Sequence, residues 1–158
     1  MRIRPAERED CEAIMLVHVG AIIEHGPKAY SDRQVATWAA KTEGVARYEQ
    51  AVEDPTTDLL VAEADGEVAG FAELDRADEK IEALFVAPEH GGSGIGTALL
   101  DECETRLRDL GVETSCLEAV LNAVGFYEAA GYERVKRVTN TTTANTEVES
   151  VKMRKPLD

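Results

Sequence analysis

The apolar residues of this 158-residue chain change their spacing near residue 55, and the change separates a helical first third from a mixed remainder. Before that point apolar residues recur every three or four positions, which is the period of a helix with one buried face. The pattern predicts three helices, over residues 9–24, from Ser31 onward and over residues 45–52, preceded by a short strand at residues 2–4. Ser31 and Gln34 have the spacing of a capping box, which starts a helix.

After residue 55 the pattern becomes that of strands. Apolar runs on either side of Asp65-Gly66 form a strong signal for a β-hairpin over residues 59–74. The sequence KIEALFVA, residues 80–87, is almost continuously apolar, which is typical of a central strand. Further strands are expected at residues 114–119, 132–138 and 147–153, the last two as a closing hairpin.

Two helices are interleaved with these strands. Over residues 95–110 Ile95, Leu99, Cys103, Leu107 and Leu110 repeat at intervals of three and four. Glu102–Arg106 and Glu104–Arg108 are i,i+4 pairs in the favourable order, and Gly111 is placed to end this helix. Residues 122–131 predict a second, short helix. The order of elements predicts an α/β fold (α+β in some schemes) with a mixed sheet, as a single domain over residues 1–158.

Charge narrows the class of protein. The chain has 31 acidic and 17 basic residues, a net charge of −14, and such a surface repels nucleic acid. No apolar run approaches the roughly 20 residues of a membrane span, and no signal-peptide pattern is present, so a soluble cytoplasmic protein is expected. The acid load, with only six lysines, favours a high-salt cytoplasm; the alternative is an ordinary acidic protein.

Cys11, Cys103 and Cys116 are far apart, which favours reduced core residues and no metal site.

The sequence FVAPEHGGSGIGTALL, residues 85–100, places four glycines between an apolar run and a helix. Unpaired N–H groups at a helix N-terminus bind anions, and glycines let the backbone approach a ligand closely. Thr97 stands where a P-loop needs lysine and where a dinucleotide-binding loop needs its third glycine, so neither motif fits. A tight strand-to-helix turn is the structural alternative. His90 is either a further ligand or a solvated loop residue.

The same stretch resembles the acyl-CoA pyrophosphate loop of the GNAT family of N-acetyltransferases, whose pattern is V-x-P-x-x-[RQ]-G-x-G-I-G-x-x-L-L. Downstream, LEAVLNAVGFYEAAGYE is similar to the family's second motif, N-x-x-A-x-x-F-Y-E-x-x-G-F. The resemblance covers essentially the whole chain. The start and the end of the chain are similar to an uncharacterised branch of the family, and this protein is expected to be a halophile member of that branch. Two positions depart from the motifs: Gly91 replaces the usual Arg or Gln, and Asn122 lies nearer Phe126 than the usual position, Val120.

This resemblance implies a mostly antiparallel sheet of six to seven strands flanked by helices, with acetyl-CoA in a V between the fourth and fifth strands. The implied function is acetyl transfer to a primary amine of a small molecule or peptide by direct attack. The alternative is a CoA-binding or regulatory protein with little or no activity. The implied cofactor residues are Leu84, Phe85 and Val86 through their backbone, Gly91, Gly92, Ser93, Gly94, Ile95, Gly96 and Thr97 at the pyrophosphate, and Asn122 and Tyr127.

The resemblance also makes Tyr127 the acid that protonates the departing thiolate, unless the ring serves only packing. Glu118 and Glu82 are candidate bases because carboxylates flanked by apolar residues can have a raised pKa. Both could instead point to solvent, and water would then accept the proton.

The acceptor site is expected beside the first helices. Aromatic residues there are candidates to line it, although such residues at helical spacing are usually core: Tyr30, Trp38 and Tyr48. The expected partners are acetyl-CoA and an amine, with no nucleic acid and no membrane; a homodimer is compatible with the sequence.

The net charge of −14 generates a first prediction. Repulsion among the excess carboxylates is screened over roughly 3 Å at 1 M salt, so the melting temperature should rise as KCl increases from low to molar concentration. Thermal unfolding followed by circular dichroism in a KCl series measures this. A melting temperature that does not depend on KCl would remove the high-salt interpretation and leave the fold prediction untouched.

Overall fold

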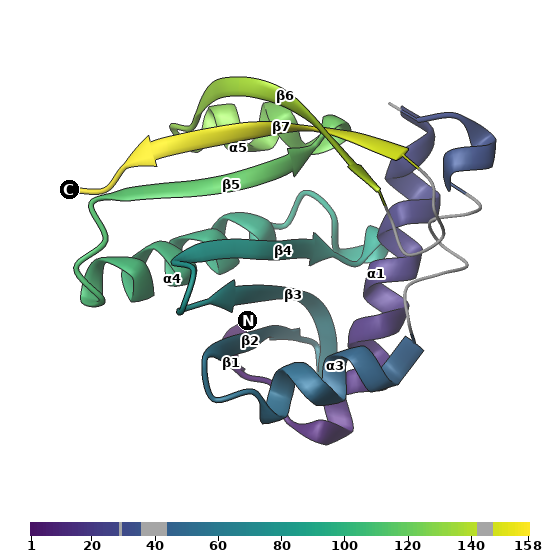
Figure 1. Ribbon diagram of the computed structural model, residues 1–158. Helices are drawn as coiled ribbons and strands as arrows, with labels where there is room; N and C mark the ends of the chain where they lie inside the picture. The colour runs from purple at the N-terminus through teal and green to yellow at the C-terminus, as the bar shows by residue number, and fades with distance from the viewer. Residues whose placement is uncertain (29, 36–43, 142–146) are drawn as a thin grey trace.

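The computed structural model describes residues 1–28, 30–35, 44–141 and 147–158, and its centre is a seven-stranded sheet (Figure 1). The strands lie in the order β1-β2-β3-β4-β5-β7-β6. Only β4 and β5 pair in parallel; every other neighbouring pair is antiparallel. The mixed α/β fold is confirmed. The strands are β1 Arg2–Pro5, β2 Thr57–Ala64, β3 Glu67–Asp75, β4 Lys80–Val86, β5 Thr114–Val120, β6 Glu133–Thr141 and β7 Glu147–Pro156.

Helices cover both faces of the sheet (Figure 1). Side chains of α1 and α3 form a core with Leu59, Val61 and Phe71, whereas those of α4 and α5 pack with Leu60 and Ala72. Successive strand residues point to opposite faces, so each pair of helices covers one face. The helices are η1 Arg8–Asp10, α1 Cys11–His25, η2 Gly26–Lys28, α3 Gly44–Glu53, η3 Pro88–His90, α4 Ile95–Asp109, η4 Leu121–Ala123 and α5 Val124–Ala129.

The local signals that start and end elements are found as predicted. Asp65 and Gly66 have φ values of 54° and 78°, the two positive values that a tight hairpin turn between β2 and β3 requires. The Gln34 N–H donates to Ser31 Oγ over 3.2 Å, and the Ser31 N–H donates to Gln34 Oε1 over 2.9 Å, which completes the predicted capping box. Gly111 follows α4 with a φ of 82°.

The cysteine prediction holds for two of the three thiols. Cys11 and Cys103 are buried, and Cys116 is half-buried. All three are free thiols. Cys116 lies on β5, so it is a partly exposed sheet residue and not a core residue.

The parallel strands β4 and β5 stay together for only two residue pairs, Lys80 with Cys116 and Ile81 with Leu117. A β-bulge follows at once: Leu74 of β3 pairs with Ile81 and Glu73 pairs with Ala83, which leaves Glu82 as the inserted residue. A bulge bends its strand and increases the local twist. The carboxyl-terminal halves of β4 and β5 therefore diverge.

Helix α4 confirms both predicted ion pairs and corrects one expectation from the sequence. Ile95, Leu99, Cys103 and Leu107 are buried as predicted, but Leu110 is 47% exposed because α4 ends at Asp109. Glu102 and Arg106 pair at 3.0 Å, and Glu104 and Arg108 pair at 3.9 Å. Glu104 is nevertheless only 2% exposed.

Glu104 also holds the C-terminal strand β7 against α4. Its Oε1 accepts a hydrogen bond from Lys155 Nζ at 2.9 Å, and its Oε2 accepts one from the Tyr132 hydroxyl, also at 2.9 Å. The Tyr132 oxygen lies 2.7 Å from Ser115 Oγ. Both carboxylate oxygens are therefore satisfied, as a buried charge requires.

This network generates a second prediction. Replacing Glu104 with alanine should lower the free energy of unfolding by about 3 kcal/mol, because Lys155 and Tyr132 lose the group that compensates their burial. The matched variant Glu102→Ala removes a partly exposed pair from the same helix and should cost less than about 1 kcal/mol. Urea unfolding of both variants measures the difference. Equal losses in the free energy of unfolding would show that the buried network stabilises the fold no more than the partly exposed pair.

Candidate active site

The turn between β4 and α4 exposes backbone N–H groups. Gly92 and Gly94 have φ values of 75° and 82°, a region that favours glycine. The first hydrogen bond of the helix runs from the Ala98 N–H to the Gly94 oxygen at 3.0 Å. The amides of residues 95–97 therefore precede the helical hydrogen bonds and remain available, together with the positive end of the helix dipole, to hold an anion.

Gly96 has a separate, steric role. A Cβ at this position would lie 3.2 Å from the Phe126 ring and 3.5 Å from Val86 Cγ2. The missing side chain thus lets the first turn of α4 contact both β4 and α5. This close approach brings the glycine turn and the second motif to the same opening.

A cleft of about 360 Å³ lies where β4 and β5 diverge. Eight of the twelve predicted cofactor residues line it: Leu84, Phe85, Val86, Gly91, Gly92, Gly96, Asn122 and Tyr127. The other four, Ser93, Gly94, Ile95 and Thr97, belong to the same turn and the first turn of α4. The structure therefore brings the two motifs together around one cleft.

Tyr127 forms part of the cleft wall contributed by α5. The residue is 6% exposed, and its ring packs edge-on against Phe126 and Tyr132, with centroids 5.1 and 5.7 Å away. None of the hydrogen bonds among the described residues uses its hydroxyl. Burial raises the pKa of the Tyr127 phenol above its ordinary value, so the group stays protonated at neutral pH.

The two candidate bases do not line this cleft. Glu118 lies 3.5 Å from Lys80 Nζ and borders a separate groove at the paired ends of β4 and β5. Glu82 is the bulge residue, and it is exposed. Its pKa is raised, chiefly because part of the carboxylate is removed from water, with Lys80 acting in the opposite direction. Their role as bases stays a prediction, and their positions give it no support.

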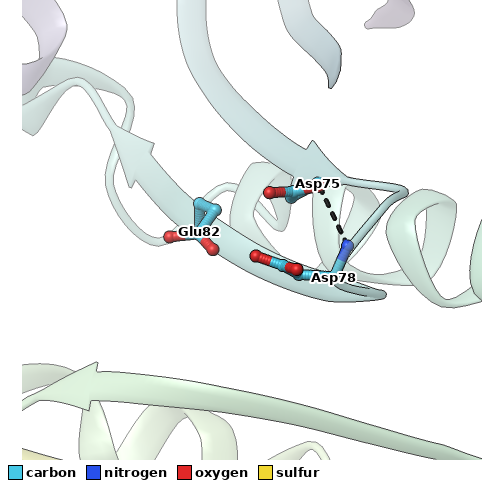
Figure 2. Close-up of side chains that lie close together, drawn as sticks. All are labelled: Asp75, Asp78 and Glu82. Atoms are coloured by element: carbon cyan, nitrogen blue, oxygen red, sulfur yellow. Dashed lines mark hydrogen bonds between the residues drawn. The ribbon is translucent and has the colours of Figure 1, made fainter. Parts of the chain in front are cut away.

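Glu82 instead joins Asp75 and Asp78 beside the β3–β4 turn (Figure 2). One carboxylate oxygen from each lies within 4.8 Å of the others. Asp75 Oδ1 already accepts hydrogen bonds from the N–H groups of Ala77 and Asp78, at 2.9 and 3.1 Å. This hydrogen bonding accounts for the position of Asp75, and the cluster lies outside the residues that line the cleft.

The aromatic candidates for an acceptor site are core residues where the structure describes them. Tyr48 is fully buried and hydrogen-bonded to His18. Tyr30 is 7% exposed, and its hydroxyl accepts the Leu121 N–H at 3.0 Å and donates to the Glu149 oxygen. Trp38 lies outside the described residues. His90 is 4.0 Å from Glu67 and does not appear in the cleft lining.

The sequence predicts an acceptor site beside the first helices, but it identifies none of the residues with which they line the cleft. The end of α1 and the turn η2 contribute one wall through Ala21, Ile22, His25, Gly26 and Lys28. No sequence pattern marks these residues as cleft residues, because only tertiary packing brings α1 to the ends of β4 and β5 (Figure 1). Helical periodicity identified the helix but not which of its residues reach the cleft.

Known proteins share this architecture. The family model described as an acetyltransferase (GNAT) domain matches residues 27–157. The chain belongs to the GNAT acetyltransferase family. The crystal structure of the GCN5-related N-acetyltransferase "Aminotransferase, Class-II" from Rhodopseudomonas palustris is similar to this GNAT enzyme with a TM-score of 0.89 and 27% identity, over 99% of this chain and 95% of that one.

Two further comparisons extend the likeness. The N-acetyltransferase YafP of Escherichia coli is 26% identical over 137 residues, which is 87% of this chain and 84% of that protein. The PaiA N-acetyltransferase of Thermoplasma acidophilum, in complex with coenzyme A, shares the fold with a TM-score of 0.78 and 23% identity over 98% of each chain. This GNAT protein is therefore an acyltransferase.

None of the described helices combines the length and the apolar character that crossing a bilayer requires.

The glycine turn generates a third prediction. Gly94→Val should abolish measurable CoA binding while the protein stays folded, because the side chain strains the backbone and occupies the approach to the free amides. Gly111 is a matched control: it also has a φ of 82° and open space for a Cβ, but it lies at the other end of α4. Gly111→Val should cost a similar 1–2 kcal/mol or so of stability and keep CoA affinity.

Isothermal titration calorimetry with CoA, together with thermal unfolding, separates the two variants. Unchanged CoA affinity in Gly94→Val would exclude the turn as the binding site. Loss of affinity in both variants would assign the effect to strain in α4.

Proposed function

We propose that the enzyme transfers the acetyl group of acetyl-CoA to a primary amine by direct attack of the amine on the thioester. The observation that carries the proposal is the cleft itself, which has an anion-binding helix N-terminus on one wall and a protonated tyrosine on another. Both walls meet where β4 and β5 separate.

The unpaired edge of β4 supports the placement of the cofactor. Beyond Ile81 the backbone of Leu84, Phe85 and Val86 has no partner strand on the β5 side among the residues that the structure describes. Backbone amides in such a position need hydrogen-bond partners, and the amides of a pantetheine arm supply them. The pyrophosphate would then lie on the N–H groups of Gly92–Thr97, which requires no basic side chain in the turn.

The chemistry needs one bond to form and one to break. The neutral amine nitrogen attacks the thioester carbon, and the C–S bond breaks as the tetrahedral intermediate collapses. Tyr127 gives its phenolic proton to the departing sulfur, and the proton lost by the nitrogen returns to the phenolate through water. The phenol is protonated before each turnover, as an acid must be, although the burial that raises its pKa also makes it a weaker acid.

A different proton must leave before the attack, because the ammonium form of the amine has to become neutral, and water is the proposed acceptor of that first proton. The described residues that line the cleft include no carboxylate, and Glu82 and Glu118 lie elsewhere. A solvated amine loses its proton to bulk buffer without a dedicated base. Turnover should then follow the ionisation of the amine itself.

The charge of the chain supports a proposed setting for this activity. A net charge of −14 with only six lysines suits a high-salt cytoplasm, where screening relieves self-repulsion.

The role of Tyr127 generates a fourth prediction. Tyr127→Phe keeps the ring contacts with Phe126 and Tyr132 and deletes the donor. Turnover should fall by about 100-fold, at the low end for general acid catalysis because a thiolate leaves readily, whereas acetyl-CoA affinity should change little. Thiol release in an amine screen measures turnover, and calorimetry measures affinity.

Tyr132→Phe is the matched control. Its hydroxyl bonds Glu104 and Ser115 and does not line the cleft, so this variant should lose stability and keep its turnover. Full turnover in Tyr127→Phe across the pH range would exclude the acid role. Equal activity losses in both variants would assign the effect to packing.

A further inference from the structure

Two side chains at the end of α1 form a donor pair on the cleft wall. Lys28 Nζ lies 2.9 Å from His25 Nδ1, and both residues line the cleft. An ammonium group has no acceptor, so Lys28 donates and Nδ1 accepts. The neutral ring then carries its proton on Nε2. The pair therefore offers the remaining ammonium hydrogens and one imidazole N–H.

The charge of this wall is opposite to that of the chain. Asp and Glu make up 31 of the 158 residues, yet the described residues that line the cleft include neither. Apart from Tyr127, His25 and Lys28 are the titratable side chains of that lining. A cationic group at this position has no lining carboxylate to neutralise it, so the cleft mouth favours anions.

The wall is held in place from three sides. A Cβ on Gly20 would lie 3.5 Å from Pro88 Cδ, so α1 passes close to the start of the glycine turn. A Cβ on Gly26 would lie 2.8 Å from Val35, so η2 packs tightly on the following helix. The Tyr30 hydroxyl accepts the Leu121 N–H just after β5. His25 and Lys28 thus lie between the glycine turn and the end of β5.

We infer that His25 and Lys28 form a second anion-binding subsite at the cleft mouth, facing the glycine turn. The inference rests on the proposed acetyl transfer and specifies what the cleft recognises: an oxyanion belonging to one of the two substrates. The oxyanion is either a phosphate of acetyl-CoA or a carboxylate on the acceptor amine. An acceptor with a second cationic group would be disfavoured, because that group would meet Lys28.

The fifth prediction tests this subsite with two variants of equal charge change. Lys28→Gln removes the ammonium group. Arg2→Gln removes one positive charge from exposed β1, at the far edge of the sheet. Affinity is measured for acetyl-CoA and for S-acetylpantetheine, which has no phosphate. Turnover is measured with amines in matched pairs, an amino acid and its amide.

Lys28→Gln should weaken oxyanion binding by about 5- to 10-fold, the scale of one charge-assisted hydrogen bond at a partly solvated site. A loss confined to acetyl-CoA, with S-acetylpantetheine unchanged, identifies the phosphate as the ligand. A rise in KM confined to the amino acid, with its amide unchanged, identifies the acceptor carboxylate. Arg2→Gln should match the unsubstituted enzyme in both assays.

If the affinities and the turnover of Lys28→Gln stay within twofold of those of Arg2→Gln in every assay, the subsite is excluded. If the proposed function is wrong, no amine will be acetylated. The affinities for acetyl-CoA and S-acetylpantetheine can still be measured in that case, and they still test the subsite. Titration with inorganic pyrophosphate and with acetate, followed by NMR on the His25 ring, adds a readout that needs no turnover. A ring signal that moves with neither anion, with acetyl-CoA affinity unchanged in Lys28→Gln, also overturns the subsite.

Discussion

The early separation of β4 and β5 is the constraint on which the site depends. Two parallel strands share only two residue pairs, and a bulge at Glu82 then turns β4 away. Backbone N–H and C=O groups on the facing edges lose the partners that a continuous sheet would supply. In most proteins such an opening would be closed by another strand or by side chains. Here the opening is the proposed binding site, and a ligand with amides of its own would complete the hydrogen bonding.

The opening persists because each strand keeps its other edge paired. β4 pairs with β3 from Gly70 to Asp75 despite the bulge, and β5 pairs with β7 along all seven of its residues. Helix α4 fixes the distance between the two halves: its first turn contacts Val86 and Phe126 at Gly96, and Glu104 binds Lys155 of β7. The same helix therefore supplies the amides proposed to bind an anion and the buried charge that holds the second half of the sheet in place.

The sequence predicted what short-range physics determines and missed what only tertiary contacts determine. Asp65-Gly66, the Ser31–Gln34 box and the glycine turn each follow from local backbone preferences, and the structure contains all three. The partner of Glu104 four residues on, Arg108, could be read along the chain, but its contact with Lys155 could not, because Lys155 is distant in sequence. Glu82 was a candidate base, and its place in a bulge could not be predicted because a bulge leaves no mark in an apolar run. His25 and Lys28 could not be placed before the packing of α1 was known.

An acidic chain repels an anionic cofactor, and only short-range contacts can outweigh that repulsion. A net charge of −14 repels CoA at a distance, and salt screens this repulsion over a few ångströms. Salt screens hydrogen-bond donors in direct contact with the ligand far less, because the ligand displaces water and ions from them. In the proposed site the donors are fixed backbone amides at the start of α4 and the His25–Lys28 pair on the facing wall, and the described residues of the lining include no carboxylate. Excess negative charge elsewhere on the surface is then compatible with anion recognition inside the cleft.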